Sequence, residues 1–577
     1  MFIKSTRAKG YEYIKLVESY RESGTTKHRV LFNFGRADVI RKDESFLNVV
    51  KRLCDVAQAP KPYSQAKEDE GNFLDDCGEA VLYNYGYLPY LQLWRELGIE
   101  GCLEEAEYGS KLTFSLPQTV FLMVCQHLLE PMSKFATFER QNRYFNMPEI
   151  PLHHMYRALD RLSKKKDEIE TGLFEYNYIR TRKTVEVVFY DLTTIHFESQ
   201  LADEELREFG FSKAGKYNEV QVVLGMIIDS SGMPVGYELH KGNTYEGHTI
   251  AETLEKIKER FKISRVIIVA DRGLNNKYGL NKIKEAGCGY IMAAKIKGAS
   301  AALQKKVFAE EGFIPIYDKK GNLELRYKVM EHENIFKDEN GVRHVLQENM
   351  VVTYSPKRAK KDKSDRERLI EKAKNLLEKP SLIDTTNKRG GRKYIDQTNK
   401  DDDKPIYALD VSKIERDSKF DGYYAIQSSE KSMNAAEVME AYHTLWKIEE
   451  SFRIMKSTLE IRPVYHSSPD RIKGHFVVCF LAFLMERKME LLLKDSANEE
   501  DCMASPQKIQ EALNTMQLAA VSTSQGEKFV KVKPHILAPK IFKRVGIDIP
   551  GNISTENDLI GRFKLNVEPT AVQMSIL

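Results

Sequence analysis

The chain has 577 residues, 42% of them hydrophobic, which supports several folded domains with a sizeable core and excludes disorder along the whole length. Lysine and arginine number 88 against 84 aspartate and glutamate, so a net charge of +4 does not by itself indicate a nucleic-acid binder. The seven scattered cysteines form no CxxC pair, which argues against a disulfide framework or a zinc site and fits a reducing cytoplasm. No apolar stretch approaches the ~20 residues of a membrane span, so no membrane anchor is expected.

The N-terminal region, residues 1–60, is locally basic. Two runs that alternate apolar and polar residues, Tyr11 to Tyr20 and His28 to Phe34, are separated by Ser23 and Gly24. This pattern is typical of a β-hairpin. A basic hairpin suits DNA, and a solvated hairpin without a partner is the alternative.

Residues 73–175 change to a helical pattern. Apolar residues recur there at spacings of three and four, first as Leu88, Leu91, Trp94 and Leu97 and later as Leu152, Met155, Leu159 and Leu162. We therefore expect a helical domain, and we assign it to DNA binding.

Residues 180–297 contain short β-rich runs separated by helical stretches. The runs are Val185 to Asp191, Val220 to Asp229, Pro234 to His240, Val266 to Asp271 and Tyr290 to Lys295. Three successive strands come first, and two more follow through helices. This mixed α/β order predicts an RNase H-like core, in which an antiparallel meander is extended by parallel strands.

Residues 298–430 interrupt this core with weaker periodicity and are expected to form an insertion subdomain. Residues 355–400 within it carry fifteen lysines and arginines against seven acids. A loop containing Arg389, Arg392 and Lys393 is a candidate for contacts with a DNA backbone. The alternative for such a charge run is a solvated helix face.

Two of the predicted strands end in an aspartate, Asp191 and Asp271. If the strands are neighbours in one sheet, the two carboxylates converge, and their repulsion is relieved by a divalent cation. Hard oxygen ligands favour Mg²⁺ or Mn²⁺. For either residue alone, a role in capping a turn or a helix is the alternative.

The second part of the core, residues 431–495, contains a long amphipathic stretch from Ala435 to Ile461. Tyr442, Glu449 and Lys456 are seven residues apart and would share one stripe of a continuous helix. Glu449 is expected at the edge of the buried face, with Glu450 turned about 100° away. In the alternative, Glu449 only forms a surface pair with Arg453.

The C-terminal segment, residues 496–577, is predicted to be helical, from Ser505 to Ala519 in particular, and carries basic residues between Lys528 and Arg544. We expect it to follow a core that is already complete. It is a candidate for a dimer contact or for a DNA clamp.

The motif Tyr442-x2-Leu445-x3-Glu449-x6-Lys456 resembles the YREK signature of DDE transposases from bacterial insertion sequences, the IS-four-like group. Leu445 stands where that group usually has arginine. The resemblance extends over most of the chain, through Tyr190-Asp191-Leu192-Thr193, Asp271-Arg272-Gly273, the Leu128 to Lys134 stretch, Arg462 to His466 and Gly474-His475. The N-terminal hairpin and the loop around Gly390 are similar to the subfamily with a long N-terminal region.

The resemblance implies that Asp191, Asp271 and Glu449 are the catalytic and metal-binding triad, holding two Mg²⁺ or Mn²⁺ ions. It also implies that Tyr442 and Lys456 grip the DNA end near the scissile phosphate. Lys447 and Arg453 lie close enough in sequence to substitute for the arginine missing at Leu445.

The function implied is DNA transposition. The protein would bind the terminal inverted repeats of an insertion sequence and catalyse metal-dependent DNA cleavage and strand transfer into target DNA. We expect a homodimer in the active complex, in the bacterial cytoplasm and at the nucleoid when acting. The alternatives are an RNase H-fold metal-dependent DNA nuclease that cuts without joining, and a catalytically inactive DNA-binding remnant.

Overall fold

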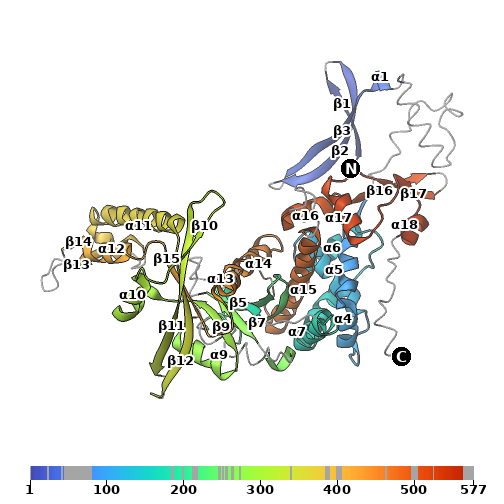
Figure 1. Ribbon diagram of the computed structural model, residues 1–577. Helices are drawn as coiled ribbons and strands as arrows, with labels where there is room; N and C mark the ends of the chain where they lie inside the picture. The colour runs from blue at the N-terminus through green and yellow to red at the C-terminus, as the bar shows by residue number, and fades with distance from the viewer. Residues whose placement is uncertain are drawn as a thin grey trace, which may run out of the picture. The chain divides into compact units, whose positions relative to one another are not determined.

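The structure is a computed structural model whose chain divides into two compact units, residues 182–452 and the combination of residues 1–181 with 453–577 (Figure 1). It describes residues 2–8, 10–22, 25–40, 43, 81–182, 187–197, 201–203, 205–210, 219–244, 249, 253, 256, 258–261, 266–271, 275–337, 341–383, 390–397, 406–461, 464, 466–494, 504–523 and 526–562. The two units are described one at a time.

The unit formed by residues 182–452 is built on one mixed sheet. Its first three strands form an antiparallel meander, and two shorter strands continue it in parallel; these are β5 (Val187–His196), β6 (Gln221–Asp229), β7 (Pro234–Lys241), β8 (Ile267–Ala270) and β9 (Gly289–Ala293). Their spatial order is β9-β8-β5-β6-β7. This order confirms the predicted RNase H-like core.

The β6–β7 turn shows how local sequence sets this meander. The Asp229 carboxylate accepts hydrogen bonds from the backbone N–H groups of Ser231 and Met233, both at 2.9 Å. Gly232 has a φ of 93°, which a residue with a side chain adopts only with strain. The predicted turn is therefore present, and the nearly continuous burial of β6 explains its run of apolar residues.

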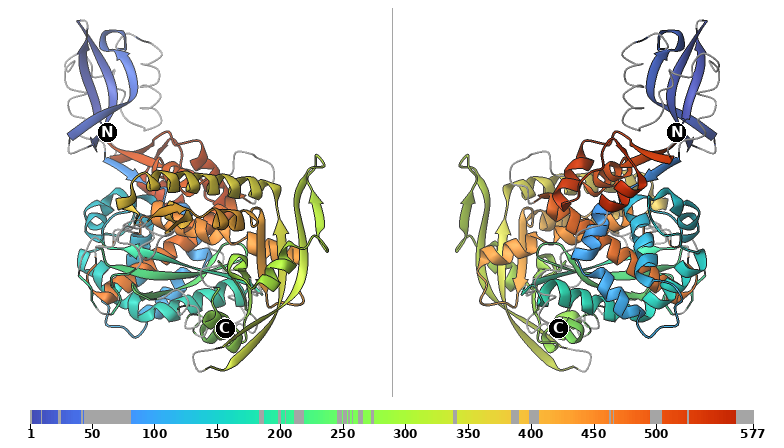
Figure 2. Two further views of the ribbon diagram at one scale, coloured as in Figure 1. Left: turned by 90° about the vertical axis from the view of Figure 1, so that its left-hand side faces the viewer. Right: turned by 90° about the vertical axis from the view of Figure 1, so that its right-hand side faces the viewer.

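The insertion continues the same sheet. Four of its strands add to the β9 edge in the order β10-β11-β12-β15-β9; they are β10 (Ile314–Tyr317), β11 (Leu323–Lys337), β12 (Arg343–Tyr354) and β15 (Tyr423–Ser428). The two long paired strands β11 and β12 are drawn in yellow-green in Figure 2. The helices are α10 (Ala301–Phe308), α11 (Pro356–Leu377) and α12 (Val411–Ser418), with a small β13–β14 ladder (Ile395–Gln397, Tyr407–Leu409). Residues on both sides of the predicted boundary at 298 share one core: Ala294, Ile296, Val307, Met350, Val352, Phe420 and Ala425.

The single helix predicted from Ala435 to Ile461 is wrong, because the chain forms α13 (Ala435–His443) and α14 (Trp446–Ser457). Between them the backbone N–H groups of Leu445, Lys447 and Ile448 each bond to the carbonyl three residues earlier. Such steps turn the chain by about 20° more than α-helical ones. Three of them rotate the downstream stripe by about 60°, so Tyr442 and Glu449 no longer share a face.

The other unit has a largely helical core. The helices are α3 (Leu88–Glu96), α4 (Ile99–Glu107), α5 (Leu116–Leu129), α6 (Lys134–Arg140), α7 (Leu152–Phe174), α15 (Pro469–Lys494), α16 (Pro506–Asn514), α17 (Leu537–Val545) and α18 (Glu556–Arg562). The apolar spacing seen between residues 73 and 175 does form helices. Of the helices described, none combines the length and apolar character that a bilayer span requires.

The C-terminal segment is not wholly helical. The helix predicted from Ser505 to Ala519 ends at Asn514, and β16 (Gln517–Thr523) follows it. This strand pairs with β4 (Val81–Asn84) and β17 (Gly526–Lys531), and β18 (Ile553–Ser554) completes a four-stranded sheet. Pairing with a strand more than 400 residues earlier overrides the local helical pattern. The segment therefore forms part of the unit of residues 1–181 and 453–577. That the catalytic core is complete without it stays a prediction.

The N-terminal hairpin is confirmed and gains a third strand. β1 (Phe2–Ala8), β2 (Tyr11–Glu22) and β3 (Thr25–Arg36) form an antiparallel sheet, followed by the short helix α1 (Ala37–Ile40). The predicted turn at Ser23 and Gly24 lies outside the described residues.

Candidate active site

Two aspartates lie close to the paired part of the central parallel strands. β5 and β8 pair in register up to Phe189 and Val269. If that register continued by two residues, Asp191 would lie beside Asp271, on the same face and at the ~4.8 Å spacing of neighbouring strands. Asp271 directly follows the end of β8, as predicted. Asp191 is not at a strand end, because β5 continues to His196 by pairing with β6.

The surroundings of the pair suit a cation. Asp191 is half-buried, and its Oδ1 accepts the backbone N–H of Leu192 at 2.8 Å. Asp271 is exposed, and among the described residues no lysine or arginine forms an ion pair with it. Carboxylate oxygens such as these are the ligands that Mg²⁺ or Mn²⁺ prefers.

Tyr442 connects α13 to this site. Its hydroxyl donates a long hydrogen bond, 3.5 Å, to Oδ1 of Asp271 and accepts one from the Tyr424 hydroxyl at 2.5 Å. Burial, followed by the bond to Tyr424, raises the pKa of Tyr442. The phenol therefore stays protonated and can donate to a carboxylate or to a phosphate oxygen.

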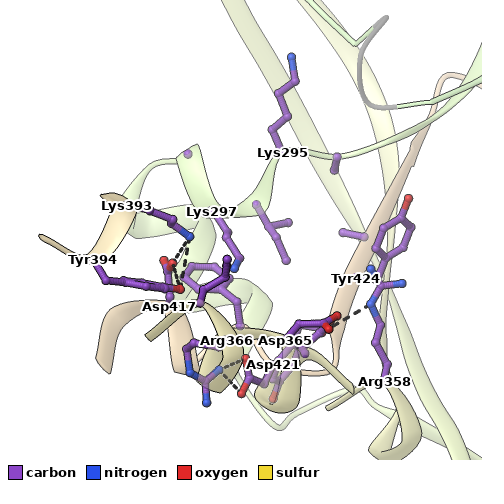
Figure 3. A pocket seen from close by; sticks show the side chains of 18 residues that line it. Lys295, Lys297, Arg358, Asp365, Arg366, Lys393, Tyr394, Asp417, Asp421 and Tyr424 are labelled. Carbon is purple, nitrogen blue, oxygen red and sulfur yellow. Dashed lines mark hydrogen bonds and ion pairs between the residues drawn. The ribbon is translucent and has the colours of Figure 1, made fainter. Parts of the chain in front are cut away.

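Tyr424, the hydrogen-bond partner of Tyr442, also lines a pocket that was not predicted from the sequence. The Arg358 guanidinium lies 4.5 Å from the centre of the Tyr424 ring. Both residues line a pocket of about 540 Å³, together with Lys295 and Lys297, which follow β9 (Figure 3). The position of these lysines just after a strand parallel to β8 is the signal that could have located them.

Glu449 is not gathered with the two aspartates. It lies exposed on α14, whereas Glu450 is half-buried, so the expectation that Glu449 borders the buried face is wrong. The rotation at the α13–α14 break is the physical reason. Among the described residues, ligand oxygens of Asp191, Asp271 and Glu449 do not all come within 4.8 Å of one another.

The other candidates around α14 are placed as follows. The Lys447 Nζ donates to the backbone carbonyl of Ser230 at 2.7 Å. Arg453 is exposed and Lys456 is half-buried. Leu445 is only 7% exposed, so at this position the chain packs a hydrophobic side chain.

The basic loop of the insertion is partly used for internal contacts. Arg389 lies outside the described residues, and Arg392 is half-buried in a short 3₁₀ turn, Gly391–Tyr394. Lys393 is bonded to Asp417, whose carboxylate also accepts the Tyr394 hydroxyl at 3.1 Å, as Figure 3 shows. Lys393 therefore has a structural ion pair that any DNA contact would have to share.

Comparison with known families gives two matches within the chain. Residues 182–485 match the model of the transposase DDE domain, which is more than half of the chain. Residues 3–65 match the model of the IS1634 family transposase, N-terminal domain.

No curated protein matches the sequence. Among solved structures, a piggyBac transposase synaptic complex with hairpin DNA is 9% identical, with coverage of 85% of this chain and 89% of that chain and a TM-score of 0.34. The Mos1 transposase paired-end complex with left transposon end is 10% identical, covers 43% and 77%, and has a TM-score of 0.14. The Mos1 mariner paired end complex with Mn is 11% identical, covers 42% and 75%, and has a TM-score of 0.13. These similarities are too remote to support conclusions about this chain.

Proposed function

We propose, from the premise that this chain belongs to the transposase DDE domain family, that Asp191, Asp271 and Glu449 are the carboxylates that carry its chemistry. With its IS1634-type N-terminal domain, the chain is an insertion-sequence DNA transposase of the DDE class. The observation that supports the proposal is the register of β5 and β8, whose continuation by two residues would set Asp191 beside Asp271.

Asp191 and Asp271 would hold two Mg²⁺ or Mn²⁺ ions between the sheet and the DNA. Bound there, the ions supply the activation of the attacking oxygen and the neutralisation of charge at the scissile phosphate. The protein's own part is to fix the two carboxylates in register on a rigid sheet. Tyr442 would donate a hydrogen bond to Asp271 or to the adjacent phosphate.

Glu449 completes this site only if α14 turns toward the sheet. The break at Thr444 and Leu445 provides a point where that rotation costs little, because its hydrogen bonds are already of the 3₁₀ type. We propose that Glu449 joins Asp191 and Asp271 when the DNA end binds, and that the three carboxylates would then hold the metal ions. The positively charged side chains of Lys447, Arg453 and Lys456 would then lie along the DNA backbone.

The finer classification rests on residues of α13 and α14. Tyr442, Glu449 and Lys456 are three of the four YREK markers, which supports the IS-four-like group. We assign the N-terminal sheet, the helical region of residues 73–175, and the loop of Arg389, Arg392 and Lys393 to binding the terminal inverted repeats. Because two element ends must be joined to one target, we also propose a homodimer in the active complex, acting at the nucleoid.

The test uses a labelled oligonucleotide carrying the inverted repeat that flanks the coding region, a supercoiled target plasmid, and Mg²⁺. We expect labelled plasmid, the product of cleavage followed by joining. Cleavage without joining would favour the nuclease alternative. Binding without cleavage would favour the inactive remnant.

A further inference from the structure

A cluster of nitrogen and sulfur side chains lies inside the unit formed by residues 1–181 and 453–577. His127 is on α5, Lys134 is the first residue of α6, and His475 and Cys479 are one turn apart on α15. Their exposed fractions are 3%, 4%, 6% and 0%. The mechanism proposed above uses none of them.

The ligand atoms of this cluster have the spacing of a metal site. One ligand atom each of His127, His475 and Cys479 lies within 4.8 Å of the others. The Cys479 Sγ is 3.5 Å from the His475 Nε2. Two ligands on a tetrahedral zinc ion are about 3.3 to 3.6 Å apart, so this pair already has the separation required.

His127 is oriented as metal-bound histidines are. Its Nδ1 is 3.2 Å from the backbone carbonyl of Leu459, to which it donates. The lone pair of Nε2 therefore points into the cluster, where the Lys134 Nζ lies 3.3 Å away. A histidine that donates its outer N–H to a carbonyl while its inner nitrogen binds a metal is the usual arrangement.

Where the structure describes the chain, two polar groups of the cluster, the Lys134 amine and the His475 Nδ1, are buried without the partners that such groups usually have. Among the described residues no carboxylate pairs with Lys134, although an unpaired buried ammonium is costly. The His475 Nδ1 is buried and has no hydrogen-bond partner within the described part of the chain.

We propose that His127, His475 and Cys479 bind one divalent ion of the zinc class. Two imidazoles and a thiolate form a borderline-soft set that selects zinc over Mg²⁺ or Ca²⁺. On binding, the Cys479 thiol releases its proton to solvent, and the ion replaces Lys134 as the partner of the His127 Nε2. The amine of Lys134 is within reach of the fourth ligand position.

The role of this ion would be structural. The carbonyl of Leu459 accepts the Nδ1–H of His127 at 3.2 Å. The carbonyl of Ile461 lies 3.5 Å from the His475 Nε2, which as a metal ligand would carry no proton to donate to it. Glu460 between them has a φ of 43°, a conformation that persists only where the surroundings impose it. These residues directly follow α14, so a metal that fixes the two histidines would anchor the end of the helix carrying Glu449.

The experiment is a Co²⁺ titration of the full-length protein, followed by absorption spectroscopy. We expect a thiolate-to-cobalt charge-transfer band that saturates at one equivalent and is bleached by Zn²⁺. Carboxylate ligands give no such band, so Co²⁺ at the aspartate pair does not interfere. Metal analysis of protein purified without chelator should find about one zinc per chain.

Cys479→Ser should abolish the band. The matched control is Cys125→Ser, which changes another fully buried free cysteine, on α5, two residues before His127. Folded wild-type protein that gives no band would overturn the proposal, whether or not the variants fold. A band that survives in Cys479→Ser would overturn it as well.

Discussion

The aspartate pair and the buried histidine cluster assemble polar side chains in opposite ways. Asp191 and Asp271 would be brought together by the register in which two strands pair, and Asp271 is exposed. His127 on α5 and His475 and Cys479 on α15 come from two helices and are closed off from water. An open carboxylate pair can admit DNA and exchange metal ions, whereas a closed set can only hold what it binds. We therefore assign the catalytic role to the aspartate pair and a structural role to the buried histidine cluster.

Asp271→Asn should produce the largest effect on activity. It keeps the shape of the side chain and removes a charged ligand from the open pair, so cleavage and joining should fall by about a thousandfold or more. Binding of end DNA, measured by gel shift, should persist. Asp229→Asn is the control, because Asp229 caps the β6–β7 turn; an equal loss in both variants would contradict the assignment.

Phe542→Ala tests how much the buried C-terminal segment contributes to the stability of its unit. Phe542 is fully buried and packs edge-to-face on Tyr85, with ring centroids 5.7 Å apart. Its removal should lower the free energy of unfolding by roughly 3–5 kcal/mol. Lys543→Ala, at the exposed neighbouring position, should change it by less than about 0.5 kcal/mol. Urea denaturation monitored by circular dichroism gives both values; a small effect of Phe542→Ala would mean that the C-terminal segment is peripheral.

The buried carboxyl group of Glu486 on α15 should make the stability of the helical unit depend on pH. Burial raises the pKa of Glu486 on α15 from 4.5 to about 8, and Tyr90 donates a hydrogen bond to its carboxyl. Because the folded state holds this proton more tightly, stability is complete below pH 4.5 and is lost as pH rises through 8. Glu486→Gln should flatten that loss in denaturation curves across this range. Glu139→Gln, an exposed control, should leave the curve unchanged.

Tyr442→Phe should have the smallest effect. It removes the 3.5 Å hydrogen bond to Asp271 and the acceptor for Tyr424 while keeping the ring. A bond of this kind contributes about 1 kcal/mol, so the cleavage rate should fall by roughly three- to tenfold with little change in DNA affinity. Tyr423→Phe, on the neighbouring residue of β15, serves as the control. An unchanged rate in Tyr442→Phe would leave the phenol a packing role only.

The secondary structure could be predicted from the sequence where the local residue pattern and the tertiary structure favour the same element. The apolar runs around Asp191 and Asp271 predicted β5 to β9, since strands buried on both faces need continuous hydrophobic residues. From that order we expected the two aspartates to lie close together, and this stays a prediction. The extension of the sheet by the insertion was not predictable in this way, because β10 is exposed along its length, so burial does not dictate its sequence.

Two other features depend on contacts distant in sequence. The break between α13 and α14 has no glycine or proline to mark it; Thr444 and Leu445 fit an unbroken helix equally well. The cluster of His127, His475 and Cys479 was not predicted from the sequence, and a zinc site was argued against. The reason is that His127 lies about 350 residues before the other two residues, so the three form no spacing motif. Only the packing of α5 against α15 reveals it.

The most direct test of the central claim compares Glu449→Gln with Glu450→Gln in cleavage of the labelled element end with Mg²⁺. Glu449 is exposed and apart from the aspartates, and Glu450 is its half-buried neighbour, so the pair separates a metal ligand from a nearby carboxylate of equal charge. We predict that Glu449→Gln binds the DNA end and fails to cut it, whereas Glu450→Gln cuts at close to the wild-type rate. Robust cleavage by Glu449→Gln would contradict the proposed triad.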